Sequence, residues 1–169
     1  MLRSTPLELH APRHGHMRHL LLSAAAGLVA TRAAAQPPRA EYYSAAALER
    51  TADSLRTAKA VAKVLGDRGA YQYVLVTRDA TGSPEQHAKW TDVMLVQAGS
   101  ATVLLGGQYQ GGHEESPGET RGGQLVGANA QRVAAGDLLV IPAGMPHQMQ
   151  IAPGRSIRYV TVKAPEPPR

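Results

Sequence analysis

The histidines of this sequence are few, and two of them occur in patterns that could form a metal site. Beyond residue 35 the chain has only three histidines: His87, His113 and His147. His87 has a carboxylate on each side, Glu85 and Asp92. Imidazoles and carboxylates together are typical ligands of divalent transition metals in proteins. The sequence therefore predicts a metal site that includes Glu85, His87, Asp92 and His147.

The first part of this predicted site lies around a short turn. Glu85 and His87 are two residues apart, so on a strand they project from the same face. Lys89-Trp90 can then reverse the chain and bring Asp92, at the start of the next strand, back beside them. Gly99-Ser100 is expected to end that strand and to begin another hairpin.

The second part of the site follows the turn-forming residues 142–146. His147, Met149 and Ile151 alternate with two glutamines, so His147 shares a face with apolar residues and should point inward. An inward histidine in a barrel either binds a ligand or hydrogen-bonds a core partner. The second role is the commoner one for a histidine taken alone, but the carboxylates around His87 favour the first.

The elements that must position these residues are a helix followed by short strands. Residues 36–43 have the composition of a linker, and Ser44 is a plausible N-cap. Apolar residues at steps of three and four from Leu48 to Leu65 predict a helix over residues 44–66 that stops at Gly66. This helix is expected to pack on the domain or on a partner subunit.

The sequence pattern of residues 69–163 is typical of a β-barrel. Short runs rich in Val, Leu, Ile, Tyr and Thr alternate with turn residues, which indicates an all-β fold. Strands are predicted at residues 71–77, 91–97, 101–105, 138–141, 147–151 and 157–163. The run at 138–141 is apolar throughout and is expected to be covered on both faces. Residues 106–130 are glycine-rich and loop-like, with one short strand possible at 124–126.

His113 lies in the long glycine-rich stretch and is interpreted as a solvated loop residue or as part of a lid over the site. Arg121, in the same stretch, could form a surface salt bridge or bind an anionic substrate. Residues 164–169 are proline-rich and are expected to form a frayed tail.

The first 35 residues resemble an export signal. Basic residues precede an apolar run at 20–30, and three alanines at 33–35 follow it, which is the pattern of a secretory signal peptide. Met17 is a possible true start. The alternative is an alanine-rich leader with no sorting role. We expect cleavage after Ala35, a periplasmic or secreted protein, and no membrane contact after cleavage.

Charge and composition argue against several function classes. Residues 1–35 hold four arginines and one glutamate, so without them the excess of basic over acidic residues falls from five to two. The remaining charges are scattered, which makes nucleic acid an unexpected partner. The sequence has no cysteine, so disulfides and thiolate ligands are excluded. No serine lies on a nucleophile turn, and no glycine loop leads into a helix as a phosphate site requires.

Two motifs resemble those of the cupin superfamily, and the likeness extends over residues 71–163. Gly136, Pro142, Gly144 and His147 fit the second cupin motif position for position, with Ile151 in place of its closing asparagine. In the first motif, His87 takes the second histidine position, Asp92 the acid and Gly99 the glycine. Glu85 stands where the family has its first histidine. More narrowly, the chain resembles small exported single-domain cupins.

The resemblance implies one jelly-roll β-barrel with an N-terminal α-helix and a homodimer, because cupins usually pair. Metal cupins commonly use three histidines and one glutamate, whereas this chain offers two histidines and two carboxylates. Such a set suits Fe²⁺, Mn²⁺ or Zn²⁺. Asp92 is one methylene shorter than glutamate, so it either binds the metal or hydrogen-bonds an imidazole that does.

The predicted function is a divalent-metal site in the barrel that acts on a small organic molecule. In an enzyme, such as an oxygenase, isomerase or lyase, Glu85 or Asp92 could serve as the general base. The alternatives are a non-catalytic cupin that binds a sugar or an organic acid in a degenerate metal site, and a structural cupin with a vestigial pocket.

Overall fold

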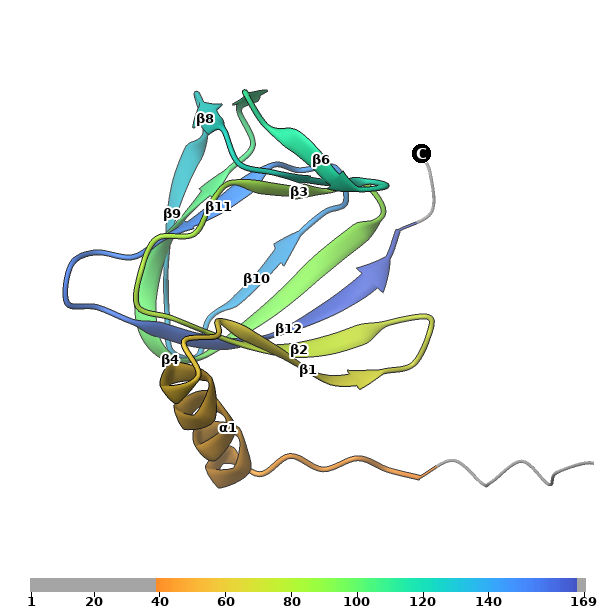
Figure 1. Cartoon of the computed structure of the whole chain (residues 1–169), viewed down its shortest axis with the longest axis vertical. Coiled ribbons are helices and arrows are strands. Elements are labelled where there is room, and N and C mark those ends of the chain that lie inside the picture. Colours follow the sequence, from red (N-terminus) through yellow and green to blue (C-terminus); the bar gives the residue numbers. More distant parts are fainter. Residues whose placement is uncertain (1–38, 167–169) are drawn as a thin grey trace, which may run out of the picture. The chain divides into compact units, whose positions relative to one another are not determined.

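The computed structural model describes residues 39–166. The predicted signal peptide lies outside these residues, as do residues 167–169 of the predicted tail. Strands predominate in the described part, with a single helix at its start (Figure 1). In chain order the elements are α1 (Ala45–Thr57), β1 (Ala62–Asp67), β2 (Gln72–Arg78), β3 (Glu85–His87), β4 (Trp90–Leu105), β5 (Gln108–Gln110), β6 (His113–Ser116), β7 (Glu119–Arg121), β8 (Gln124–Val126), β9 (Asn129–Ala134), β10 (Leu138–Ile141), β11 (His147–Gln150) and β12 (Ile157–Pro165).

The long strand β4 belongs to both layers of the barrel. Its first half pairs with β10 on one side and with β12 on the other, and β2 and β1 continue that layer. Its second half pairs with β9 and β11, and β3, β7 and β6 continue the other layer. All these pairings are antiparallel. The predicted all-β barrel with one N-terminal helix is therefore confirmed within the described residues.

The core fills the space between the two layers. Alternation along β2 turns Val74 and Val76 inward, while Leu75 faces the opposite way. Leu75 packs against the apolar side of α1, whose buried residues are Leu48, Ala52 and Leu55. The helix thus covers the outer face of β2 (Figure 1).

Gly99 lets β4 pass from one layer to the other. The sequence predicted a hairpin at this position. Gly99 has a φ of 75°, and a Cβ there would lie 1.9 Å from the carbonyl oxygen of Ser156. The β4–β12 register shifts next to this point, between Arg158 and Tyr159. The prediction that Gly99-Ser100 ends a strand was wrong. Glycine is needed at this position because β4 bends there and the backbone of Ser156 approaches it closely, within one continuous strand.

The helix is shorter than the predicted range of 44–66. Ser44 caps it as expected, accepting a hydrogen bond from the backbone N–H of Ala47. It ends at Thr57, and Lys59 adopts a φ of 54°. The later part of the predicted stripe forms β1, because pairing with β2 satisfies its backbone. Leu65 still packs with the helix cluster, but from a strand.

Two further sequence predictions are corrected. The stretch 106–130 is not mainly loop. It contains β5, β6, β7 and β8 and the start of β9, and the possible strand at Gln124–Val126 is present as β8. The run at Leu138–Ile141 is covered on one face only, because Leu138 and Val140 are 64% and 52% exposed. No described element packs over this outer face of β10.

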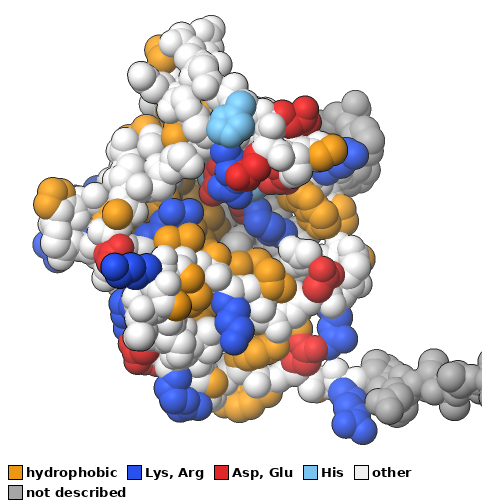
Figure 2. Space-filling view, viewed as in Figure 1, with side chains coloured by type: hydrophobic (Ala, Val, Ile, Leu, Met, Phe, Trp, Pro, Cys, Tyr) orange, Lys and Arg blue, Asp and Glu red, His pale blue; other side chains and the backbone are white. Residues whose placement is uncertain are grey.

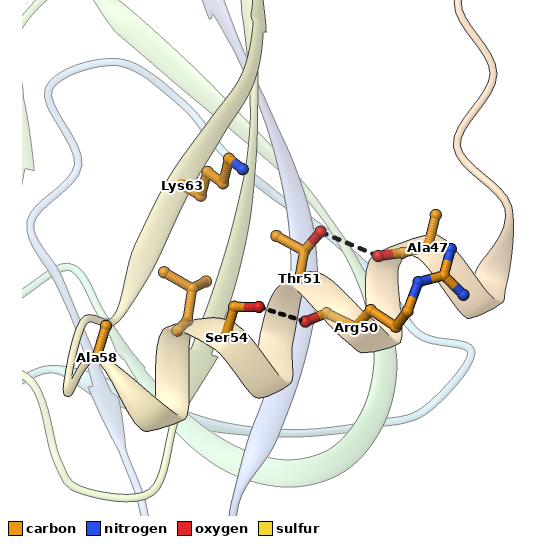
Figure 3. Close-up of a pocket in the computed structure, with 7 residues that line it drawn as sticks. Ala47, Arg50, Thr51, Ser54, Ala58 and Lys63 are labelled. Carbon is orange, nitrogen blue, oxygen red and sulfur yellow. Dashed lines mark hydrogen bonds between the residues drawn. The ribbon is translucent and has the colours of Figure 1, made fainter.

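A groove lies outside the barrel, between α1 and β1. It has a volume of about 450 Å³ and is lined mainly by the polar side of the helix and by Lys63 (Figure 3). The hydroxyls of Thr51 and Ser54 donate to carbonyls of their own helix, those of Ala47 and Arg50. The groove is therefore a solvated helix flank. No helix within residues 39–166 combines the length and apolar character needed to cross a membrane.

Candidate metal site

The predicted site residues come from three strands that meet inside the barrel. Glu85 and His87 lie on β3, and His147 lies on β11 directly opposite Glu85. Asp92 lies near the start of β4 and pairs with Ile141 and Lys163. His87, Asp92 and His147 are only 3%, 2% and 2% exposed. The inward orientation predicted for His147 from its alternation with Met149 and Ile151 is confirmed.

Asp92 reaches the histidines by a different route from the one predicted. Among the described residues, β3 pairs with β11 and β7 and not with β4. The chain instead crosses between the layers at residues 88–89. The side chains then meet across the barrel interior, so no β3–β4 hairpin is needed.

Three of the four side chains form a compact group of potential ligands. Glu85, His87 and His147 each offer one ligand atom, and these atoms all lie within 4.8 Å of one another. The His147 Nε2 atom lies 3.5 Å from Glu85 Oε1, and the two imidazole centres are 5.3 Å apart. Such spacing suits atoms that converge on one ion, because metal–ligand distances are close to 2 Å.

Both imidazoles are oriented through their Nδ1 atoms. His87 Nδ1 lies 2.5 Å from a carboxylate oxygen of Glu119 on β7, and His147 Nδ1 lies 3.1 Å from the carbonyl oxygen of Met145. Both of these partners are acceptors, so each Nδ1 atom carries a proton, and the Nε2 atom of each ring faces the carboxylates of the cluster. Metal-binding histidines are commonly held in this way.

The Nε2 atom of His147 is buried and has no hydrogen-bond partner among the described residues. A buried polar atom without a partner is uncommon and requires an explanation. A metal ion among Glu85, His87 and His147 would supply the missing interaction. The donor set and the orientation of both rings therefore fit a divalent transition metal.

Asp92 is shared between the histidines and a lysine. Its Oδ2 atom lies 3.4 Å from His87 Nε2 and 3.7 Å from His147 Nε2. Its Oδ1 atom accepts hydrogen bonds from Lys163 Nζ at 2.9 Å and from Thr161 Oγ1 at 3.3 Å. One oxygen thus faces the predicted ligands, while the other is held by β12. Lys163 Nζ also lies 3.0 Å from His87 Nε2.

The electrostatics of the site keep its carboxylates ionised. Burial would raise the pKa of Glu85, but His147, Arg121 and His87 outweigh it and lower that pKa. Burial would also raise the pKa of Asp92, and His87 and Lys163 lower it. For His87, burial lowers the pKa and Lys163 adds to this, but hydrogen bonds and charge from Asp92 and Glu119 raise it overall.

A cavity of about 430 Å³ opens beside the site. Its lining includes Glu85, Asp92, Tyr159, Lys163 and Arg78. Figure 2 shows the hollowed face of the barrel, with Lys and Arg side chains in and around the hollow and acidic side chains along its upper edge. This volume lies within the range of about 300–1,000 Å³ typical of small-molecule sites.

Arg121 and His113 occupy distinct environments. Arg121 donates to Glu85 Oε2 at 2.5 Å and pairs with Glu115 at 2.7 Å, so it is a half-buried ion-pair partner at the cavity wall. His113, on β6, is exposed.

Sequence reasoning did not predict roles for Glu119, Thr161 and Lys163. Thr161 and Lys163 continue the inward face of β12 that begins with Ile157 and Tyr159, and polar residues at inward positions were a usable signal. Glu119 reaches His87 because β7 pairs with β3 in register. That pairing depends on turns among closely spaced glycines, which the sequence pattern did not resolve.

Comparison with known proteins places the fold. The sequence matches no protein-family profile, and no curated protein is significantly similar to it. Among solved structures, BH2720 from Bacillus halodurans is 17% identical, with 78% of this chain and 86% of that chain covered and a TM-score of 0.53. A cupin-2 domain-containing protein from Shewanella frigidimarina is 16% identical, with 61% and 78% covered and a TM-score of 0.42.

The polyketide cyclase RemF from Streptomyces resistomycificus is also similar, at 20% identity and a TM-score of 0.44. The match covers 63% of this chain and 66% of RemF, just under two thirds of that protein. The likeness to BH2720 and the antiparallel strand order show that the chain has a jelly-roll type of β-barrel fold. The barrel predicted from the two motifs is thereby confirmed, and a cupin-2 domain protein is among the solved structures similar to the chain.

Proposed function

We propose that this protein is a metal-dependent cupin that acts on a small organic molecule in the barrel cavity. The observation that carries the proposal is the orientation of the two imidazoles. Both Nδ1 atoms are held by acceptors, and the Nε2 atom of His147 is buried beside Glu85 without a partner. The ion would be Fe²⁺, Mn²⁺ or Zn²⁺, held by Glu85, His87 and His147, with Asp92 as a further candidate ligand.

The bound metal would supply Lewis acidity or a site for O₂. The side chains of the cavity would bind the substrate and provide the general base. The cavity beside Glu85 and Asp92 would take up the substrate, and Lys163 and Thr161 would hold Asp92 in place. Whichever of Glu85 and Asp92 is not bound to the metal would be the candidate general base, because both carboxylates line the cavity.

Replacing Glu119 by glutamine tests this proposal without removing a ligand. The carboxylate of Glu119 orients His87 and increases the basicity of its ring, so we expect Glu119→Gln to weaken Mn²⁺ or Zn²⁺ binding by about 10- to 100-fold. Calorimetric titration of the metal-free chain measures this change. Glu49→Gln also neutralises one glutamate but acts on α1, where Glu49 pairs with Arg158, and should leave the affinity unchanged. Equal affinities in both variants would contradict the proposed role of Glu119.

A second candidate function is a non-catalytic cupin that binds a sugar or an organic acid without a metal. The position of Lys163 favours this alternative, because its ammonium group already interacts with His87 and Asp92. Arg121 likewise balances the charge of Glu85. In this case the metal-free chain would bind its ligand, and no divalent ion would change its melting temperature.

Homodimer formation and export complete the proposal. The outer face of β10 and β4 exposes Leu95, Leu138 and Val140, an apolar surface of the kind that a second copy of the chain would cover. Light scattering during size-exclusion chromatography would show twice the chain mass, and a monomer would exclude the dimer. Mass analysis of the N-terminus after expression tests cleavage at Ala35.

A further inference from the structure

One arginine inside the barrel lacks a carboxylate partner. Arg78 follows Val74 and Val76 on the inward side of β2 and lines the cavity beside the site. Its Nε atom is buried and has no hydrogen-bond partner among the described residues. Arg121 and Arg158 pair with glutamates, whereas Arg78 forms no ion pair with any carboxylate in residues 39–166.

The guanidinium of Arg78 is positioned by its neighbours. It lies against Gly82, where a Cβ would approach its Nη1 atom to 2.7 Å. It also interacts with the hydroxyl of Tyr159, a residue only 3% exposed. The phenol of Tyr159 can donate a hydrogen bond to a ligand in the cavity that it lines.

Tyr159 and Arg78 line the same cavity as Glu85 and Asp92 of the candidate metal site. The hydroxyl of Tyr159 interacts electrostatically with all three of these residues. A ligand in this cavity would therefore meet the carboxylates of the candidate metal site as well as the guanidinium of Arg78 and the phenol of Tyr159.

We propose that Arg78 and Tyr159 form an anion subsite that binds the carboxylate of a small organic acid, whose other end carries an oxygen group directed at the metal site. Guanidinium matches carboxylate geometry with two parallel hydrogen bonds, and such bonds are strong where water is excluded. The Nε atom of Arg78 is buried without a hydrogen-bond partner, and no carboxylate in residues 39–166 pairs with its charge, so a carboxylate ligand would supply both an acceptor and a counter-ion. This inference names the substrate class and rests on the proposed function.

The test uses linear dicarboxylates from malonate to adipate as probes, with succinamide as the neutral control. Binding to the metal-loaded and the metal-free chain is measured by calorimetry. We expect at least one dicarboxylate to bind and succinamide to bind far more weakly. Arg78→Gln is expected to weaken dicarboxylate binding by about 10- to 100-fold, the value of one charge-assisted contact. Arg78→Lys keeps the positive charge but cannot form two parallel hydrogen bonds to a carboxylate, so it should give an intermediate loss of dicarboxylate binding.

Arg158→Gln is the matched control. Arg158 also has a buried Nε atom without a partner, but its guanidinium pairs with Glu49 of α1. This variant should bind dicarboxylates as the wild-type chain does. Unchanged dicarboxylate binding by folded Arg78→Gln would overturn the subsite. So would a wild-type chain that binds none of these acids.

The metal affinity separates this inference from the proposed function. Arg78→Gln should bind Mn²⁺ as tightly as the wild-type chain, because Arg78 contacts none of the candidate ligands. If the wild-type chain binds no metal, but its dicarboxylate binding still depends on Arg78, the subsite stands and the metal-dependent function fails. If metal binds normally and Arg78→Gln has no effect on the acids, the subsite alone fails.

Discussion

Replacing His147 by alanine is expected to weaken binding of Mn²⁺ or Zn²⁺ by at least about 100-fold. Structural zinc sites with four ligands have binding free energies on the order of 10–16 kcal/mol, so one ligand contributes about 3 kcal/mol. His147 Nε2 is the buried atom that the ion would satisfy, and it lies 3.5 Å from Glu85. Calorimetric titration of the metal-free chain measures the change.

His113→Ala is the control for this prediction. It also removes one imidazole, but from an exposed position on β6, and should leave the metal affinity unchanged. Because His147 is only 2% exposed, the alanine variant leaves a cavity, and its melting curve must show that it folds. His147→Gln fills most of that space and should lose metal binding as well. A folded His147 variant with wild-type affinity would contradict the predicted ligand set.

Replacing Lys163 by methionine is expected to destabilise the metal-free chain by about 3 kcal/mol, because it leaves the buried carboxylate of Asp92 without its cation. The ammonium group of Lys163 lies 2.9 Å from Asp92, whose side chain is 3% exposed. The same substitution removes a positive charge that lies 3.0 Å from His87 Nε2. A divalent ion would then meet less repulsion and would restore much of the lost stability.

Chemical denaturation with and without metal measures both effects. The difference in free energy of unfolding between the metal-loaded and the metal-free chain should be larger for Lys163→Met than for the wild-type chain. Lys63→Met removes an exposed lysine from β1 and should change neither quantity. An unchanged metal-free stability would show that Lys163 is not the counter-ion of Asp92, and a smaller gain on metal binding would contradict its competition with the ion.

The candidate site could be predicted because its chemistry is rare in this sequence. After residue 35 only three histidines had to be weighed, and strand alternation was enough to point His147 inward. The roles of Glu119 and Lys163 were not foreseen, because they depend on which strands become neighbours. Arg78 could have been noticed, since it extends the inward row of Val74 and Val76.

The fold was predicted in outline, and two of its local differences from the prediction have a clear physical cause. The motifs around Gly99 and His147 indicated a cupin barrel, and the strand order agrees with it. The apolar stripe from Leu48 to Leu65 suited a long helix, yet its last third forms β1, because an antiparallel partner outweighs helix propensity. The sequence predicts a turn at Gly99, because it does not reveal how closely Ser156 approaches this glycine.

We propose that the imidazoles of His87 and His147 and the carboxylate of Glu85 together hold one divalent metal ion. Elemental analysis of the purified chain, after dialysis against Fe²⁺, Mn²⁺ or Zn²⁺ and removal of free ion, tests it most directly. We expect about one equivalent of at least one of these metals per chain, and its loss in His147→Ala. A folded wild-type chain that retains none of the three metals would contradict it.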